Sequence, residues 1–133
     1  MSAVQRFTEG LGFPEGPVRL NDGRFLFVEM TPDTGCVTLV SADGKTKTRI
    51  AKTGRPNGLA VDAKGNIWVA ETAQCALVRL QLDGSQEQMA TEFGGEPFLF
   101  LNDVAVGPDG NVYFTDSGVA MDEFAPNGEL NPD

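Results

Sequence analysis

The sequence repeats itself about every 42 to 45 residues, and this repeat limits the fold more than any other feature. Its clearest markers are the turn glycines Gly23, Gly65 and Gly110, which lie 42 and 45 residues apart. Each glycine stands between two short apolar stretches, and the second stretch ends on an acidic residue. This pattern is typical of a β-hairpin. The three predicted hairpins are 16–29, 58–71 and 103–116.

A second hairpin follows in the first two repeats, over 37–50 and 77–90. A complete repeat therefore has four strands, which is the strand number and length of one blade of a β-propeller. Helical spacing of apolar residues is nearly absent, so an α/β fold is disfavoured. We expect an all-β chain with about two and a half blades. Their approximate bounds are 10–50, 51–95 and, for the first hairpin of the third blade, 96–118, followed by an irregular tail at 119–133.

The number of predicted strands is too small to close a propeller, because these rings have roughly four to eight blades. Open blade faces and unpaired strand edges favour association. Two interpretations stay open. The chain is part of a longer protein, or two or more copies assemble into a homo-oligomer that completes the ring.

The composition of the 133 residues excludes several kinds of chemistry. There is no histidine, so Ser-His-Asp and Cys-His nucleophile pairs and imidazole metal ligands are absent. The formal net charge of −9 disfavours nucleic acid and anionic membranes as partners. No stretch approaches the roughly 18 apolar residues of a membrane helix, and the start lacks the apolar core of a secretory signal. We expect a cytoplasmic protein, with Cys36 and Cys75 as buried free thiols.

Three oxygen-bearing residues, Glu15, Asn57 and Asn102, occupy the same place in the three repeats, just before the first strand of each hairpin. Innermost propeller strands line the central channel, so equivalent positions form a ring. Ca²⁺ takes about six to eight oxygen ligands, and a zinc-type site is disfavoured without histidine or clustered cysteine. Three ligands are too few, so other blades or water must supply the rest. The alternative is that each residue only forms a turn.

Other recurring residues have simpler interpretations. Glu29, Glu71 and Asp116 end the second strand of each hairpin, and we interpret them mainly as turn and solubility residues, with Asp116 as the exception to consider. Trp68 and Tyr113 are expected to pack between blades.

The motifs FPEGPV (13–18), PNGLAVD (56–62), LNDVAV (101–106) and DGNVYFTDS (109–117) closely resemble the gluconolactonase and regucalcin (senescence-marker-protein-like) family. The resemblance covers about residues 10–118. It implies a six-bladed propeller with one divalent cation in the central channel. Members of this family hydrolyse sugar lactones, and relatives act on other esters and phosphotriesters.

The same resemblance implies roles for individual residues. Glu15 and Asn102 become metal ligands, and Asn57, Asn102 and Asp103 become substrate contacts. The family also uses an Asn and an Asp from later blades, and this Asp is the usual general-base candidate. These blades are absent here, so the catalytic residue of this chain is unknown. The expected cation is Ca²⁺, with Zn²⁺, Mg²⁺ or Mn²⁺ as alternatives.

The resulting hypothesis is a gluconolactonase-like lactone hydrolase, in which the cation polarises the lactone carbonyl and activates water. A neutral lactone or ester suits the negative charge of the chain better than an anion does. Two alternatives remain. One is a non-catalytic half-propeller that serves as an assembly module, and the other is a phosphotriester or aryl-ester hydrolase.

Overall fold

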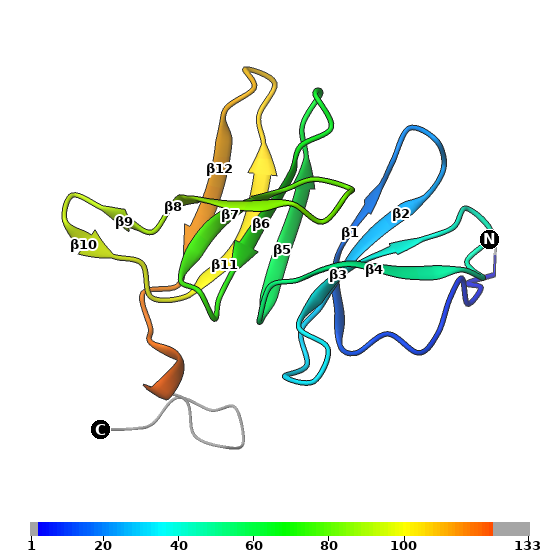
Figure 1. Cartoon of the computed structure of the whole chain (residues 1–133), viewed down its shortest axis with the longest axis horizontal. Helices are drawn as coiled ribbons and strands as arrows, with labels where there is room; N and C mark the ends of the chain where they lie inside the picture. Colours follow the sequence, from blue (N-terminus) through cyan, green and yellow to red (C-terminus); the bar gives the residue numbers. More distant parts are fainter. Residues whose placement is uncertain (1–2, 124–133) are drawn as a thin grey trace.

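The computed structural model describes residues 3–123, which form antiparallel β-sheets and almost no helix (Figure 1). The all-β prediction is therefore confirmed. The first sheet has the strand order β1 (Pro14–Arg19), β2 (Phe25–Glu29), β3 (Cys36–Val40), β4 (Lys47–Lys52). The second sheet repeats this order with β5 (Pro56–Val61), β6 (Ile67–Glu71), β7 (Ala76–Leu80), β8 (Gln86–Ala90).

The third repeat consists of one hairpin, β11 (Leu101–Val106) with β12 (Val112–Asp116). A small pair, β9 (Glu92–Phe93) with β10 (Glu96–Pro97), precedes it, and a short 3-10 helix spans Met121–Glu123. The predicted division into blades at 10–50, 51–95 and 96–118 stays a prediction. Residues 124–133 of the predicted tail lie outside the described residues.

The apolar core lies between neighbouring sheets. Leu26 and Val28 from β2 pack with Ile67 and Val69 from β6, and all four are at most 1% exposed. Burying each such side chain contributes about 1.5–3 kcal/mol. The central strand β6 is apolar on both faces because the first sheet covers one face and β11 covers the other. A second cluster joins the second sheet to β11 through Ala70, Leu77, Leu101 and Val104.

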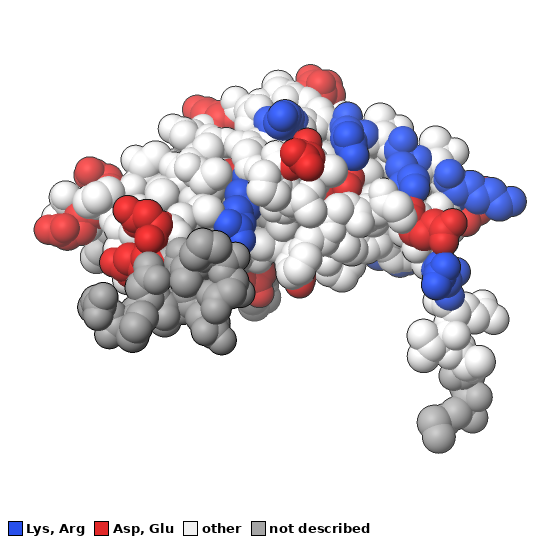
Figure 2. Space-filling model, turned by 90° about the horizontal axis from the view of Figure 1, so that it is seen from below, with Lys and Arg blue, Asp and Glu red and all other residues white. Residues whose placement is uncertain are grey.

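The outer strands differ from the central ones because each has only one strand neighbour. β4 and β8 are largely exposed and polar. β4 carries Lys47, Arg49 and Lys52, and Figure 2 shows Lys and Arg side chains gathered toward the end of the molecule that holds the first sheet. Lysine on an edge strand hinders pairing with another chain.

The two aromatic residues predicted to pack between blades behave differently. Trp68 is half-buried against the second apolar cluster, and its Nε1–H donates to Asp62 Oδ2 over 3.1 Å. This prediction is confirmed for Trp68. It is wrong for Tyr113, which is 56% exposed, because no sheet covers that face of β12 within residues 3–123. Its hydroxyl donates to Asp109 Oδ2 instead.

Both cysteines are free thiols, as predicted, but only Cys36 is buried. Cys75 is partly exposed, and its single S–H lies within reach of two acceptors, the carbonyl oxygens of Thr72 and Leu99. Within the described part of the chain, no helix is long and apolar enough to cross a membrane. The cytoplasmic location stays a prediction.

Candidate functional site

The strand register shows that Glu15, Asn57 and Asn102 occupy equivalent positions. In each hairpin, the inner strand (β1, β5 or β11) begins with a residue that pairs with the acid at the end of the second strand (β2, β6 or β12). The candidate oxygen donor is the next residue of the inner strand. The pairs are Pro14 with Glu29, Pro56 with Glu71, and Leu101 with Asp116. The pairing becomes irregular, as in a β-bulge, at Asn57 and Asn102, and directly after Glu15, which itself still pairs with Val28. A bulge re-aims side chains and is frequent next to functional sites.

These donor side chains are available to a ligand. Glu15 and Asn102 are exposed, and Asn57 is half-buried. No side-chain hydrogen bond links any of the three to another described residue. Because none of the three side chains hydrogen-bonds to the strand start beside it among the described residues, they suit a binding role better than a turn-stabilising one.

Close glycine contacts bring the beginnings of the inner strands together. Gly16 has a positive φ of 55°, and a β-carbon placed there would lie 3.0 Å from the backbone nitrogen of Leu59 on β5. In the same way, a β-carbon on Gly58 would lie 2.6 Å from Asp103 Cα on β11. The strands β1, β5 and β11 therefore lie side by side, with Glu15, Asn57 and Asn102 at a common edge.

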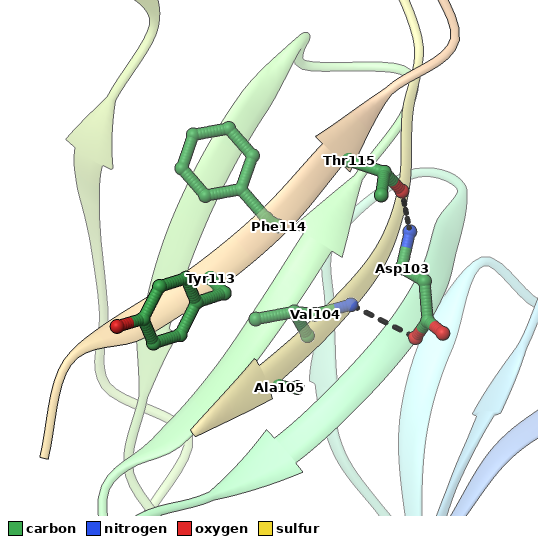
Figure 3. Close-up of a pocket in the computed structure, with 6 residues that line it drawn as sticks. All are labelled: Asp103, Val104, Ala105, Tyr113, Phe114 and Thr115. Atoms are coloured by element: carbon green, nitrogen blue, oxygen red, sulfur yellow. Dashed lines mark hydrogen bonds between the residues drawn. The ribbon is translucent and has the colours of Figure 1, made fainter. Parts of the chain in front are cut away.

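The third bulge is built from polar groups (Figure 3). Asp103 stands where the other repeats have Gly16 and Gly58. Its backbone N–H donates to Thr115 Oγ1 over 3.1 Å, and its Oδ1 accepts the N–H of Val104 over 2.8 Å. These residues line a shallow pocket of about 160 Å³ together with Ala105, Tyr113 and Phe114. Side chains thus satisfy backbone groups that the bulge leaves without strand partners.

The interpretation of Glu29 and Glu71 as solubility residues is wrong. They are only 1% and 0% exposed. Glu29 Oε2 accepts the N–H of Gly12 over 2.7 Å, and its Oε1 accepts the hydroxyl of Thr38 over 2.5 Å. Glu71 accepts the backbone N–H groups of Arg55 and Gln74. Each carboxylate therefore holds the loop that precedes an inner strand.

Asp116 makes the same contact in the third hairpin, although its side chain is exposed. Its Oδ2 accepts the N–H of Leu99 over 3.0 Å, and its Oδ1 accepts the N–H groups of Phe100 and Gly118 over 2.9 and 3.0 Å. Asp116 was the expected exception among the three acids, but the structure gives all three the same contact. The only sequence signal for this shared contact was that the three acids recur at the same position of each hairpin.

The two buried glutamates have pKa shifts of opposite direction. Burial raises the pKa of Glu71 above its usual value, although the amides of Arg55 and Gln74 oppose this. Burial also acts to raise the pKa of Glu29, but hydrogen bonds from Gly12, Thr38 and Cys36 and the charge of Arg49 outweigh it, so that pKa is lowered. The Arg49 Nε lies 3.7 Å from Glu29 Oε1.

The donor set suits a hard cation in kind but not in number. It offers one carboxylate, two amide oxygens and the neighbouring Asp103, which match the oxygen preference of Ca²⁺. Within residues 3–123, no group of three His, Cys, Asp or Glu side chains could hold a metal by itself. The described residues would thus supply only part of such an oxygen shell.

Four-stranded antiparallel sheets that present their innermost strands side by side are characteristic of β-propellers. Comparison with known proteins gives the family: the chain belongs to the SMP-30/gluconolactonase/LRE-like family, whose profile matches residues 13–130. The resemblance seen in the sequence is therefore confirmed, and so is the propeller fold. The ring is not closed within the described residues.

Three known proteins illustrate the similarity. A gluconolactonase from Zymomonas mobilis is 27% identical over 126 residues, covering 85% of this chain and 35% of the relative. Strictosidine synthase-like 11 from Arabidopsis thaliana is 41% identical over 70 residues, covering 51% and 21%. The structure of a gluconolactonase from Xanthomonas campestris matches with a TM-score of 0.75 at 23% identity, covering 92% of this chain and 40% of that one. The chain thus spans less than half the length of each.

Proposed function

We propose that this chain forms the metal-binding and substrate-binding part of a lactone hydrolase of the gluconolactonase type. The observation that carries the proposal is the common edge of β1, β5 and β11, where Glu15, Asn57 and Asn102 are each the second residue of the strand and lie at or beside a bulge. The family, which includes a gluconolactonase from Zymomonas mobilis, supports the lactone as substrate.

The expected ion is Ca²⁺, with Zn²⁺, Mg²⁺ or Mn²⁺ as alternatives, and Glu15 and Asn102 would hold it. A bound cation of this kind polarises a carbonyl group and makes a bound water more acidic. The Glu15 carboxylate supplies the negative charge that a divalent ion requires. Asn57 and Asn102 would orient the hydroxyl groups of a sugar lactone, because amides both donate and accept hydrogen bonds, and the Asp103 carboxylate would accept from those hydroxyl groups.

The substrate is proposed to be neutral, since the net charge of −9 repels anions. The general base is assigned to none of these residues. An Asp from blades beyond the third remains the expected candidate. Hydrolysis of an aryl ester or a phosphotriester would use the same oxygen donors, and only the residues that surround the substrate would differ.

A second proposal follows from the incomplete donor set. The chain covers only 35% of the gluconolactonase relative and offers fewer oxygens than Ca²⁺ takes. The chain would then be a non-catalytic half-propeller. It would bind a cation and serve as an assembly module for further blades, and it would not hydrolyse lactones.

The test measures hydrolysis of δ-gluconolactone by the purified chain in millimolar Ca²⁺, corrected for spontaneous hydrolysis, with phenyl acetate and a phosphotriester as comparison substrates. Lactone turnover that disappears with a chelator and in Glu15→Gln supports the hydrolase. Ca²⁺ binding without turnover supports the second proposal. A folded chain that neither binds Ca²⁺ nor hydrolyses any substrate contradicts both.

A further inference from the structure

The three repeats share a contact that no ligand role accounts for. In each hairpin, the carboxylate that ends the second strand accepts backbone N–H groups from the loop just before the inner strand. The residues whose N–H groups make these hydrogen bonds lie one or two positions before the inner strand begins. They are Gly12 for Glu29, Arg55 for Glu71, and Leu99 and Phe100 for Asp116.

This contact fixes the backbone immediately before each oxygen donor. In the third hairpin, the Asp116 side chain holds residues 99 and 100, and its backbone pairs with Leu101. Asn102 comes next, at the start of the bulge. Three consecutive residues are therefore anchored to Asp116, and the first free side chain after them is that of Asn102.

Each carboxylate also reaches a second segment. Asp116 binds Gly118 in the turn after β12, Glu71 binds Gln74 in the turn after β6, and Glu29 binds Thr38 on β3. A bridging carboxylate with two oxygens holds both segments at once. Hydrogen bonds to a charged acceptor are roughly twice as strong as neutral ones. The loop before the inner strand is thus tied to the rigid sheet.

We propose that Glu29, Glu71 and Asp116 are positioning residues, which set the directions of the Glu15, Asn57 and Asn102 side chains by anchoring the backbone that leads to them. The inference rests on the proposed function only for the identity of the ligand that Glu15, Asn57 and Asn102 bind. The anchoring itself is independent of any ligand.

The test uses Asp116, because this side chain is exposed and its replacement leaves no buried cavity. Asp116→Asn removes one acceptor oxygen and the charge, and Asp116→Glu keeps both oxygens and the charge but moves them by one methylene. The matched control is Asp109→Asn at the opposite end of the same hairpin, where the carboxylate binds Asn111 and Tyr113.

Two readouts are measured on the full chain. The first is the NMR signals of the Asn102 side-chain amide together with hydrogen exchange of the Leu99 and Phe100 amides, all without metal. The second is affinity for terbium(III), a luminescent ion that replaces Ca²⁺ in oxygen sites. We expect both Asp116 variants to shift the Asn102 signals and speed exchange. We expect Asp116→Asn to weaken terbium binding about tenfold, as losses behind a metal ligand typically do.

Unchanged Asn102 signals in a folded Asp116→Asn variant overturn the inference. So does an Asp116→Glu variant that matches the parent, since charge rather than position would then be responsible. If Asp116→Asn does not fold, Asp116→Glu carries the test. Absence of terbium binding by the parent contradicts the proposed metal site, and the Asn102 signals then decide the positioning role alone. Equal effects of Asp109→Asn also overturn it.

Discussion

Gly58 lies directly against the backbone of Asp103: a β-carbon on Gly58 would be 2.6 Å from Asp103 Cα and 2.7 Å from its Oδ1. The two residues belong to the inner strands β5 and β11. Their contact sets the spacing of these strands at the edge where Asn57 and Asn102 lie. The absence of a side chain at position 58 is therefore a condition for bringing the two amide donors together.

Gly58→Ala should destabilise the chain by about 1–3 kcal/mol, because the new methyl group meets backbone that cannot move aside. The free energy of unfolding in urea measures the effect. Gly65→Ala separates the two sources of cost, because no atom lies within 4 Å of its β-carbon position and any loss of stability there comes from its backbone φ of 84° rather than from a clash. Equal stability of Gly58→Ala and the parent would contradict this packing.

Glu15→Gln should weaken terbium(III) or Ca²⁺ binding by at least about tenfold, because even groups behind a metal ligand contribute 10–100-fold. The substitution keeps the shape of the side chain and removes its charge. Glu87→Gln is the control, since Glu87 pairs with Arg79 between the strands β7 and β8. Calorimetry or terbium luminescence measures affinity, and an unchanged value for Glu15→Gln would sink the ligand assignment.

The opposite pKa shifts of Glu29 and Glu71 predict opposite pH dependence of two matched variants. The lowered pKa of Glu29 means that its charged form stabilises the fold above about pH 4.3, and that this contribution is lost as the pH falls. Glu29→Gln should therefore cost more stability at neutral pH than in acid.

The raised pKa of Glu71 has the reverse consequence. Its protonated form stabilises the fold below about pH 4.3, and this contribution is lost as the pH rises through the higher folded-state pKa. Glu71→Gln should cost less at neutral pH than in acid. Urea unfolding across this pH range compares the two variants, and parallel pH profiles would refute the assigned environments.

The strand β12 should promote self-association. It pairs only with β11 among the described residues, carries Tyr113 largely exposed, and has no lysine or arginine, unlike the edge strand β4. Tyr113→Lys should lower the average mass measured by sedimentation at high concentration, whereas Gln86→Lys on β8 should not. A mass of 14.2 kDa for the parent at every concentration would rule out this association.

The repeat allowed most strands to be predicted closely. The strand predicted to begin at residue 37 begins at Cys36, and the one predicted to begin at 77 begins at Ala76. Apolar residues at strand spacing between glycine turns are a local signal, so they need no knowledge of the rest of the chain. The pair β9–β10 was not predicted, because strands of two exposed residues have no apolar pattern.

The equivalence of Glu15, Asn57 and Asn102 was also visible in the sequence, since repeats align residue by residue. The sequence did not show that their side chains are free of hydrogen bonds to other described residues. Whether an amide at a strand start is free or bonded depends on which groups the fold brings near it.

The sequence by itself thus determined most of the strands, their repeat and the identity of the candidate oxygen ligands, because these follow from local pattern and periodicity. Only the tertiary structure decided that Glu29 and Glu71 are buried and that, with Asp116, they hold the loops before the inner strands. The partners of these acids in those loops lie 16 or 17 residues away along the chain. A carboxylate at a strand end has the same local sequence whether water or a returning loop supplies its hydrogen bonds, and the path of that loop decides between them.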